Sequence, residues 1–149
     1  MKSLFDPKDN QEVIDRILKV DVQHAPQWGK MSASQMLTHC EAPLKVAFGE
    51  LKLKRGLMGV LFGKMVKKKL TNDLPFEKNM PTDKAFIVKH DPEFESAKNN
   101  LISLVKRFSD KGPSALISEP HPFFGKLTTE EWDKLQWKHL DHHLRQFGN

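Results

Sequence analysis

The chain has 149 residues and a formal net charge of +5, and its 38% hydrophobic and 29% charged residues are typical of a soluble globular protein rather than a disordered one. This length predicts one domain over residues 1–149, because a second domain would be too small to bury its own core. A single cysteine, no apolar leader and no apolar run of about 20 residues predict a cytoplasmic location rather than secretion or membrane spanning.

The first half of the chain predicts two amphipathic helices and one weaker, basic helix. Apolar residues share one face of a helix within residues 9–20. After a loop, Ser32 and Gln35 have the spacing of a capping box, so we expect a second helix to begin there and to end near Phe48. The segment over residues 51–69 contains three glycines, which weaken any helix that forms there.

The second half predicts two more amphipathic helices after a long, proline-containing loop over residues 71–92. The first of them begins with Asp91 as its cap and ends near Gly112. The second begins at a capping box headed by Thr128 and ends near Phe147. Four amphipathic helices without a substantial sheet predict an all-α fold, a four-helix bundle with a long loop and a short basic extra segment.

The last of these helices carries two histidines on its apolar side. At about 100° per residue, His139 and His143 lie within roughly 40° of each other, and Leu135 and Leu140 share their face. His142 lies on the flank of that face. Two imidazoles four residues apart on a buried face can converge on a metal ion. The same spacing suits two hydrogen-bonded core histidines, and spacing alone favours neither interpretation.

A third ligand for such an ion would have to come from another helix, and His39 is the candidate. It lies at the edge, rather than the centre, of the apolar stripe formed by Met36, Cys40 and Leu44. A half-exposed histidine without a ligand role fits this position equally well. Cys40 points about 100° away from His39, so we interpret it as a small core residue.

These residues together resemble a known group of proteins. His39 in the second predicted helix, the motif HxxHHxxQ at residues 139–146 and a bundle of this length are similar to the DinB-like superfamily of metal-binding four-helix bundles. The stretch over residues 121–148 resembles an uncharacterised branch of that superfamily. The resemblance implies that His39, His139 and His143 hold one divalent metal ion.

The resemblance also implies chemistry for that ion. Characterised members of the superfamily include thiol-dependent S-transferases and a thiol-dependent isomerase, so the resemblance implies a metal-dependent enzyme that acts on a small-molecule substrate. A low-molecular-weight thiol would then be a second cofactor, and metal-assisted hydrolysis is the other option. Zn, Ni, Fe and Mn are the candidate metals. Candidate hydrogen-bond partners of the ligands are Glu41, Gln146 and Asp141, although Asp141 points to the polar face of its helix and is interpreted as solvated.

A non-enzymatic function is the alternative. The chain would then be a helical binding or stress-associated module in which the metal, or the histidines alone, are structural. No catalytic or cofactor-binding residue is predicted from the sequence. Dimers are common in the DinB-like superfamily, so a homodimer is a further expectation, although no residue here marks an interface.

The positive charge is concentrated between residues 51 and 72, which contain seven basic residues and no acidic one. The chain has 24 basic residues in total, so 17 remain elsewhere against 19 acidic ones. This distribution argues against nucleic acid as a partner. Three interpretations of the segment stay open: a solvated face, a rim that attracts anionic substrates, and an interfacial helix that contacts a membrane surface through residues 51–69. The basic residues are Lys52, Lys54, Arg55, Lys64, Lys67, Lys68 and Lys69.

Overall fold

The computed structural model describes residues 2–54 and 56–149, so Arg55 of the basic segment lies outside the described residues. Over those ranges the protein is all-helical, which confirms the predicted fold class. It has no β-strand there beyond one isolated bridge between His121 and Gly125. The elements in chain order are α1 (Pro7–Leu18), α2 (Ala33–Ala47), α3 (Leu57–Leu70), the 3-10 helix η1 (Lys84–Phe86), α4 (Phe94–Lys111), the 3-10 helix η2 (Gly112–Ala115) and α5 (Thr129–Gln146).

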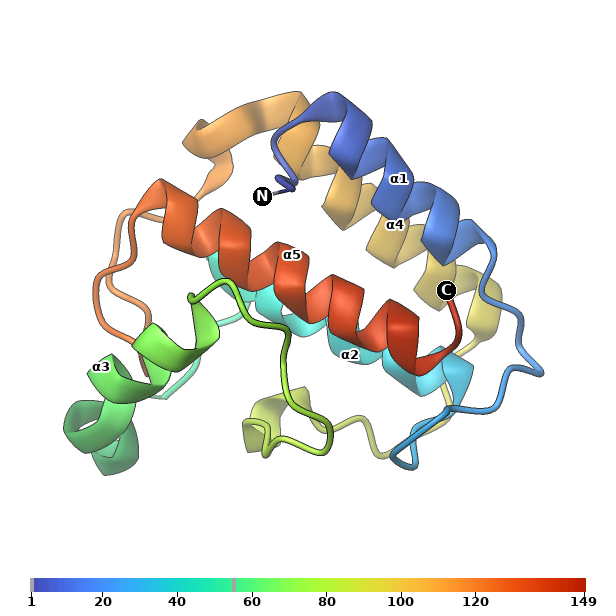
Figure 1. The fold of residues 1–149 in the computed structure, drawn as a ribbon, viewed down its shortest axis with the longest axis horizontal. Coiled ribbons are helices and arrows are strands. Elements are labelled where there is room, and N and C mark those ends of the chain that lie inside the picture. Colours follow the sequence, from blue (N-terminus) through green and yellow to red (C-terminus); the bar gives the residue numbers. More distant parts are fainter. Residues whose placement is uncertain (1, 55) are drawn as a thin grey trace.

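Helices α1, α2, α4 and α5 form the bundle (Figure 1). Helix α4 packs along both α1 and α2, and α5 packs against α2 and α1. Their facing sides bury an apolar core in which Met36, Leu101, Phe108 and Leu140 are at most 1% exposed. Burying one such side chain stabilises the fold by about 1.5–3 kcal/mol, so tertiary packing rather than helix propensity holds these helices together.

Two helix starts follow from the predicted capping boxes. The Ser32 hydroxyl accepts a hydrogen bond from the backbone N–H of Gln35, and the Gln35 side chain accepts one from the backbone N–H of Ser32. Thr128 and Glu131 make the same reciprocal pair at the start of α5. Each box satisfies two backbone donors that the first turn of a helix leaves free, and both predicted starts are confirmed.

The start predicted for the third amphipathic helix is wrong, because α4 is capped by Glu93 rather than by Asp91. The Glu93 carboxylate accepts hydrogen bonds from the backbone N–H groups of Glu95 and Ser96. The Asp91 carboxylate lies 3.4 Å from the Ser32 hydroxyl at the start of α2 instead. The capping residue is the one whose side chain accepts hydrogen bonds from free backbone N–H groups of the first turn, and Glu93 is positioned to do this.

Helix α3 lies outside the bundle (Figure 1) and is helical for 14 residues despite its glycines. The long loop over residues 71–92 leads from it to α4 and passes the side of the bundle on which α2 and α5 meet. Along this loop the ring of Phe76 faces His142, and that of Phe86 faces His39. The loop therefore covers part of the seam between α2 and α5. None of the described helices is long and apolar enough to cross a membrane.

Candidate metal centre

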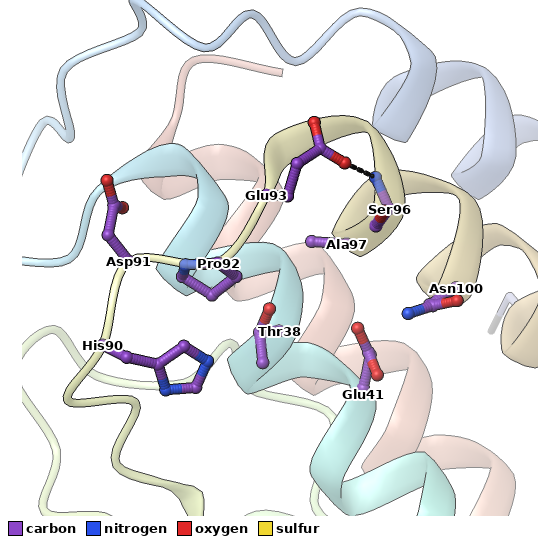
Figure 2. A pocket seen from close by; sticks show the side chains of 9 residues that line it. All are labelled: Thr38, Glu41, His90, Asp91, Pro92, Glu93, Ser96, Ala97 and Asn100. Atoms are coloured by element: carbon purple, nitrogen blue, oxygen red, sulfur yellow. Dashed lines mark hydrogen bonds between the residues drawn. The ribbon is translucent and has the colours of Figure 1, made fainter.

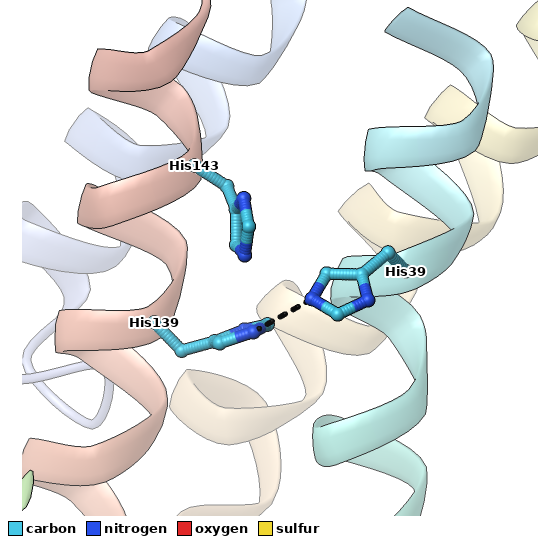
Figure 3. Close-up of side chains that lie close together, drawn as sticks. All are labelled: His39, His139 and His143. Carbon is cyan, nitrogen blue, oxygen red and sulfur yellow. Dashed lines mark hydrogen bonds between the residues drawn. The ribbon is translucent and has the colours of Figure 1, made fainter. Parts of the chain in front are cut away.

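Three histidines converge where α2 and α5 pack together (Figure 3). Each offers one ring nitrogen, and these nitrogens all lie within 4.8 Å of one another. His39 comes from α2, whereas His139 and His143 come from α5, and Nε2 of His39 lies 3.1 Å from Nε2 of His139. The structure thus brings together all three histidines that the sequence singled out. In the described part of the chain no other set of three or more histidine, cysteine or carboxylate side chains gathers in this way.

His39 is more deeply buried than a residue at the edge of an apolar stripe would be. It is 4% exposed, so the interpretation as a half-exposed histidine is wrong. Helix α2 is covered on more than one side, because it packs against α4, α5 and η1. His39 lies at the edge of the apolar stripe of α2, but because several elements surround this helix, a residue at that edge is still covered by a neighbouring element. His143 is also buried and His139 is partly exposed, so the cluster lies at the edge of the core.

A backbone carbonyl fixes the orientation of the His39 ring. Nδ1 of His39 lies 2.8 Å from the carbonyl oxygen of Phe86 in η1. A carbonyl oxygen only accepts hydrogen bonds, so Nδ1 of His39 carries the proton and donates. In the neutral ring, Nε2 then presents a lone pair to the other two histidines, which is the state in which imidazole binds a metal ion.

A longer hydrogen-bond chain fixes the ring of His143. The amide nitrogen of Gln146 donates to the carbonyl oxygen of Trp28 over 2.6 Å, so the Gln146 oxygen faces His143. Nδ1 of His143 lies 2.7 Å from that oxygen and donates to it. Nε2 of His143 is thereby left as an acceptor directed at the cluster (Figure 3). Two loops that are distant in sequence, at Trp28 and Phe86, thus hold two of the three rings.

Only one of the three predicted partners of the ligands takes that place. Among the hydrogen bonds and ion pairs of the described residues, Gln146 contacts a cluster histidine, whereas Glu41 and Asp141 do not. The Glu41 carboxylate pairs with Lys45 at 2.6 Å. The Asp141 carboxylate pairs with Arg16 of α1 at 2.9 Å. These two carboxylates stabilise contacts within and between helices instead.

Burial keeps the cluster neutral. Removal from water, reinforced by the neighbouring His39 ring, lowers the pKa of His143 to about 3. Burial also holds the pKa of His139 well below its usual range, with the other two rings acting in the same direction. It lowers the pKa of His39 too, against the opposing effect of the Phe86 carbonyl. All three imidazoles are therefore in the metal-binding form at neutral pH.

The donor set fits a transition-metal ion. Two nitrogens bound tetrahedrally to the same Zn²⁺ ion at about 2.0–2.1 Å lie roughly 3.3–3.4 Å apart. The Nε2 atoms of His39 and His139 are 3.1 Å apart, close to that separation. Nε2 of His39 and Nε2 of His143 are both acceptors. A single N–H of His139 could donate a hydrogen bond to one of them but not fully to both. One cation can serve all three lone pairs, and imidazole is a preferred ligand of Zn, Ni and Fe.

The remaining predicted polar positions lie outside the cluster. His142 flanks it, as predicted, with its ring 5.0 Å from that of His143 and 5.5 Å from that of Trp28. Cys40 is buried against Met36, and burial raises the pKa of its thiol. A buried, protonated thiol is a core residue rather than a nucleophile, in agreement with the sequence-based interpretation.

Two backbone groups that hold the site were not predicted. The carbonyl oxygens of Phe86 and Trp28 orient the His39 ring and, through Gln146, the His143 ring. Every residue carries such a carbonyl, so residue type gives no signal for either position. Only the three-dimensional course of the loops reveals them.

One cavity is separate from the cluster. It has a volume of about 380 Å³ and lies between α2 and the start of α4 (Figure 2). Its walls include Thr38 and Glu41 of α2 and the loop residues His90 and Asp91, but none of the three cluster histidines. A second cavity of about 230 Å³ shares Thr38, Glu41 and His90 with it.

Comparison with known families gives one match. The model of a family described as "Protein of unknown function (DUF1569)" matches residues 3–149, a range that includes the cluster and both loops that hold it. No curated protein and no solved structure matches the chain.

Proposed function

The chain belongs to the DUF1569 family of proteins of unknown function, and we propose that it binds one divalent transition-metal ion through Nε2 of His39, His139 and His143. The observation that carries this proposal is the convergence of three neutral imidazoles within 4.8 Å. Two of the rings have their proton on the outward nitrogen. Zn, Ni, Fe and Mn are the candidate ions, and metal analysis of the purified protein identifies which one is bound.

We further propose that the chain is a single DinB-like domain and a metal-dependent enzyme. Three protein ligands leave at least one position for water or substrate, which is the arrangement of catalytic rather than closed structural sites. Such an ion supplies Lewis acidity and lowers the pKa of a bound water or thiol. The reaction class that follows is S-transfer to or from a low-molecular-weight thiol, or hydrolysis, on a small-molecule substrate.

The protein's own residues have a defined part in this function. Phe86 and Gln146 hold the His39 and His143 rings in one tautomer. The loop that contains Phe76 and Phe86 lies beside the cluster, with the Phe86 ring near His39 and the Phe76 ring near the flanking His142. Lys138 ties the start of this loop to α5 through hydrogen bonds to the carbonyl oxygens of Leu70 and Asn72, at 2.7 and 2.9 Å.

The first prediction concerns metal content. Protein purified without an affinity tag should contain about one transition-metal ion per chain, and the His143→Ala variant should contain almost none. His24→Ala is the matched control, because His24 is an exposed loop histidine outside the cluster. Elemental analysis by mass spectrometry measures all three proteins. Equal, near-zero metal in wild type and His143→Ala would contradict the proposal.

A structural role for the metal is the second candidate function. The ligands join α2 to α5, and none of them lines either cavity. In this case chelation should lower the melting temperature strongly in wild type but not in His139→Ala, and no turnover should occur in thiol-transfer and hydrolase assays. Turnover that requires the metal and is absent from His139→Ala would support the enzyme instead.

A further inference from the structure

Helix α3 presents its large apolar side chains to solvent. Six of them between residues 57 and 65 are 42 to 80% exposed. We call this set the apolar surface of α3. A surface helix normally turns such residues toward the core and leaves polar ones outside, and exposed apolar groups of this size mark interaction sites. The members are Leu57, Met58, Val60, Leu61, Phe62 and Met65.

The opposite face of α3 explains this orientation. Gly59 and Gly63 are buried against the backbone of Phe123 in the connection between α4 and α5. A Cβ atom at Gly59 would lie 2.9 Å from Cα of Phe123, and one at Gly63 would collide with the Phe123 carbonyl oxygen. The helix thus packs against Phe123 through its two glycines. A face with larger side chains could not approach the Phe123 backbone so closely. The apolar side chains of α3 are held outward by this contact.

Positive charge adjoins the apolar surface along the chain. Residues 51–72 contain no acidic residue. Lys67 pairs with Glu131 of α5 at 2.8 Å, and Lys69 pairs with Glu77 at 3.0 Å. Within the described residues, Lys64 and Lys68 make no ion pair. The surface therefore combines exposed apolar groups with cations whose charge is not neutralised by the protein.

We propose that the apolar surface of α3 docks onto an anionic lipid membrane. A helix lying in the membrane interface buries apolar side chains below the headgroups, while lysines on its flanks contact lipid phosphate and carboxylate groups. Long lysine side chains reach the headgroup level even when their backbone lies deeper. Charge complementarity selects this partner over a second copy of the chain, because two such basic surfaces repel each other.

Vesicle co-sedimentation tests the apolar part of the surface. Wild type should bind vesicles of phosphatidylcholine and phosphatidylserine at a ratio of about three to one and should not bind phosphatidylcholine alone. Leu61→Gln combined with Met65→Gln should weaken binding at least about tenfold. Leu18→Gln is the control, because Leu18 is 55% exposed at the end of α1. It should bind like wild type, and circular dichroism confirms that the variants are folded.

The charge is tested in the same assay. Each lysine near an anionic surface strengthens binding about fivefold, so Lys64→Glu with Lys68→Glu should weaken it at least about 25-fold. Lys8→Glu in α1 with Lys19→Glu at its C-cap changes the net charge equally and should have little effect. Failure of wild type to bind, or equal binding by the α3 and control variants, overturns the proposal. Self-association that Leu61→Gln abolishes, without vesicle binding, overturns it in favour of a second copy.

Discussion

Gln146 controls the cluster through the direction of its hydrogen bonds. Its amide nitrogen can only donate, and it donates to the Trp28 carbonyl, so its oxygen must accept from Nδ1 of His143. Gly29 allows this contact, because a Cβ there would lie 2.7 Å from the Gln146 amide nitrogen, and its φ of +79° favours glycine. A loop far from the ligands in sequence thereby sets the protonation pattern of one ligand.

The second prediction concerns Gln146. Gln146→Leu removes the acceptor of the His143 proton and should weaken metal affinity about 10- to 100-fold. Gln146→Glu keeps an acceptor for His143 but loses the donor to the Trp28 carbonyl, so its affinity should fall between those of Gln146→Leu and wild type. Competition with a chromogenic chelator measures the affinities, and NMR of the ring nitrogens reports the His143 tautomer. Wild-type affinity and an unchanged tautomer in Gln146→Leu would show that the contact does not position the ring.

At the level of single residues, the sequence predicted which three histidines converge and the Gln146 contact, but not the backbone carbonyls that hold the rings. The i, i+4 spacing places His139 and His143 on one face whatever the tertiary structure. The burial of His39 depends on how many helices pack against α2. The periodicity of the α2 sequence does not reveal that number. Glu41 and Asp141 are acceptors close in sequence to the cluster histidines, but each forms an ion pair with a basic neighbour instead.

At the level of elements, the glycines of α3 reverse an ordinary expectation. Alanine is about 1 kcal/mol more favourable than glycine inside a helix. At Gly63, however, the added Cβ would collide with the Phe123 carbonyl. The contact with Phe123, rather than helix propensity, therefore decides whether alanine at this position stabilises or destabilises the protein.

The third prediction is that Gly63→Ala destabilises the docking of α3 by about 1–3 kcal/mol. Gly56→Ser is the control, because a Cβ at Gly56 has open space around it and serine is a good N-cap residue. Hydrogen exchange of the α3 amides should accelerate in Gly63→Ala and not in Gly56→Ser. Unchanged exchange in both variants would contradict the packing described for α3.

Element boundaries were predictable where the signal was local. Ser32 and Thr128 head capping boxes that depend only on residues three positions apart, and both helices begin there. The start of α4 was predicted at Asp91, but that carboxylate faces Ser32 of another helix. The side on which α3 docks was not predictable either, because Phe123 lies in a distant connection and sequence spacing does not reveal such contacts.

At the level of the whole molecule, buried neutral histidines link folding to pH. Burial lowers the pKa of His121 to about 4, and those of the three cluster histidines are lowered as well. The usual histidine value of 6.5 applies to the unfolded chain. As pH falls below it, the unfolded chain binds protons before the folded one does. Stability is therefore complete above about pH 6.5 and falls toward pH 4.

The fourth prediction uses His121, which is remote from the metal ligands in sequence. Its Nδ1 accepts from the backbone N–H groups of Phe123 and Phe124 at 3.1 and 3.2 Å, and asparagine can replace that acceptor without titrating. In excess chelator, His121→Asn should lose less stability than wild type between pH 6.5 and 4.5, by up to about 1.4 kcal/mol per pH unit.

Urea unfolding at several pH values measures this difference. His24→Asn is the control, because His24 is exposed in a loop and should leave the slope unchanged. A slope in His121→Asn equal to that of wild type would mean that His121 is not held neutral by the fold.

The separation of the ligands in the chain also has a consequence for biosynthesis. His39 and His139 are 100 residues apart. At synthesis rates of about 5–20 residues per second, His39 leaves the ribosome roughly 5–20 s before its partners. During that interval the nascent chain offers a metal ion one imidazole of the cluster instead of three. If the cluster binds the proposed ion, coordination by all three histidines requires α5 to dock onto α2, so the complete site forms only late in synthesis.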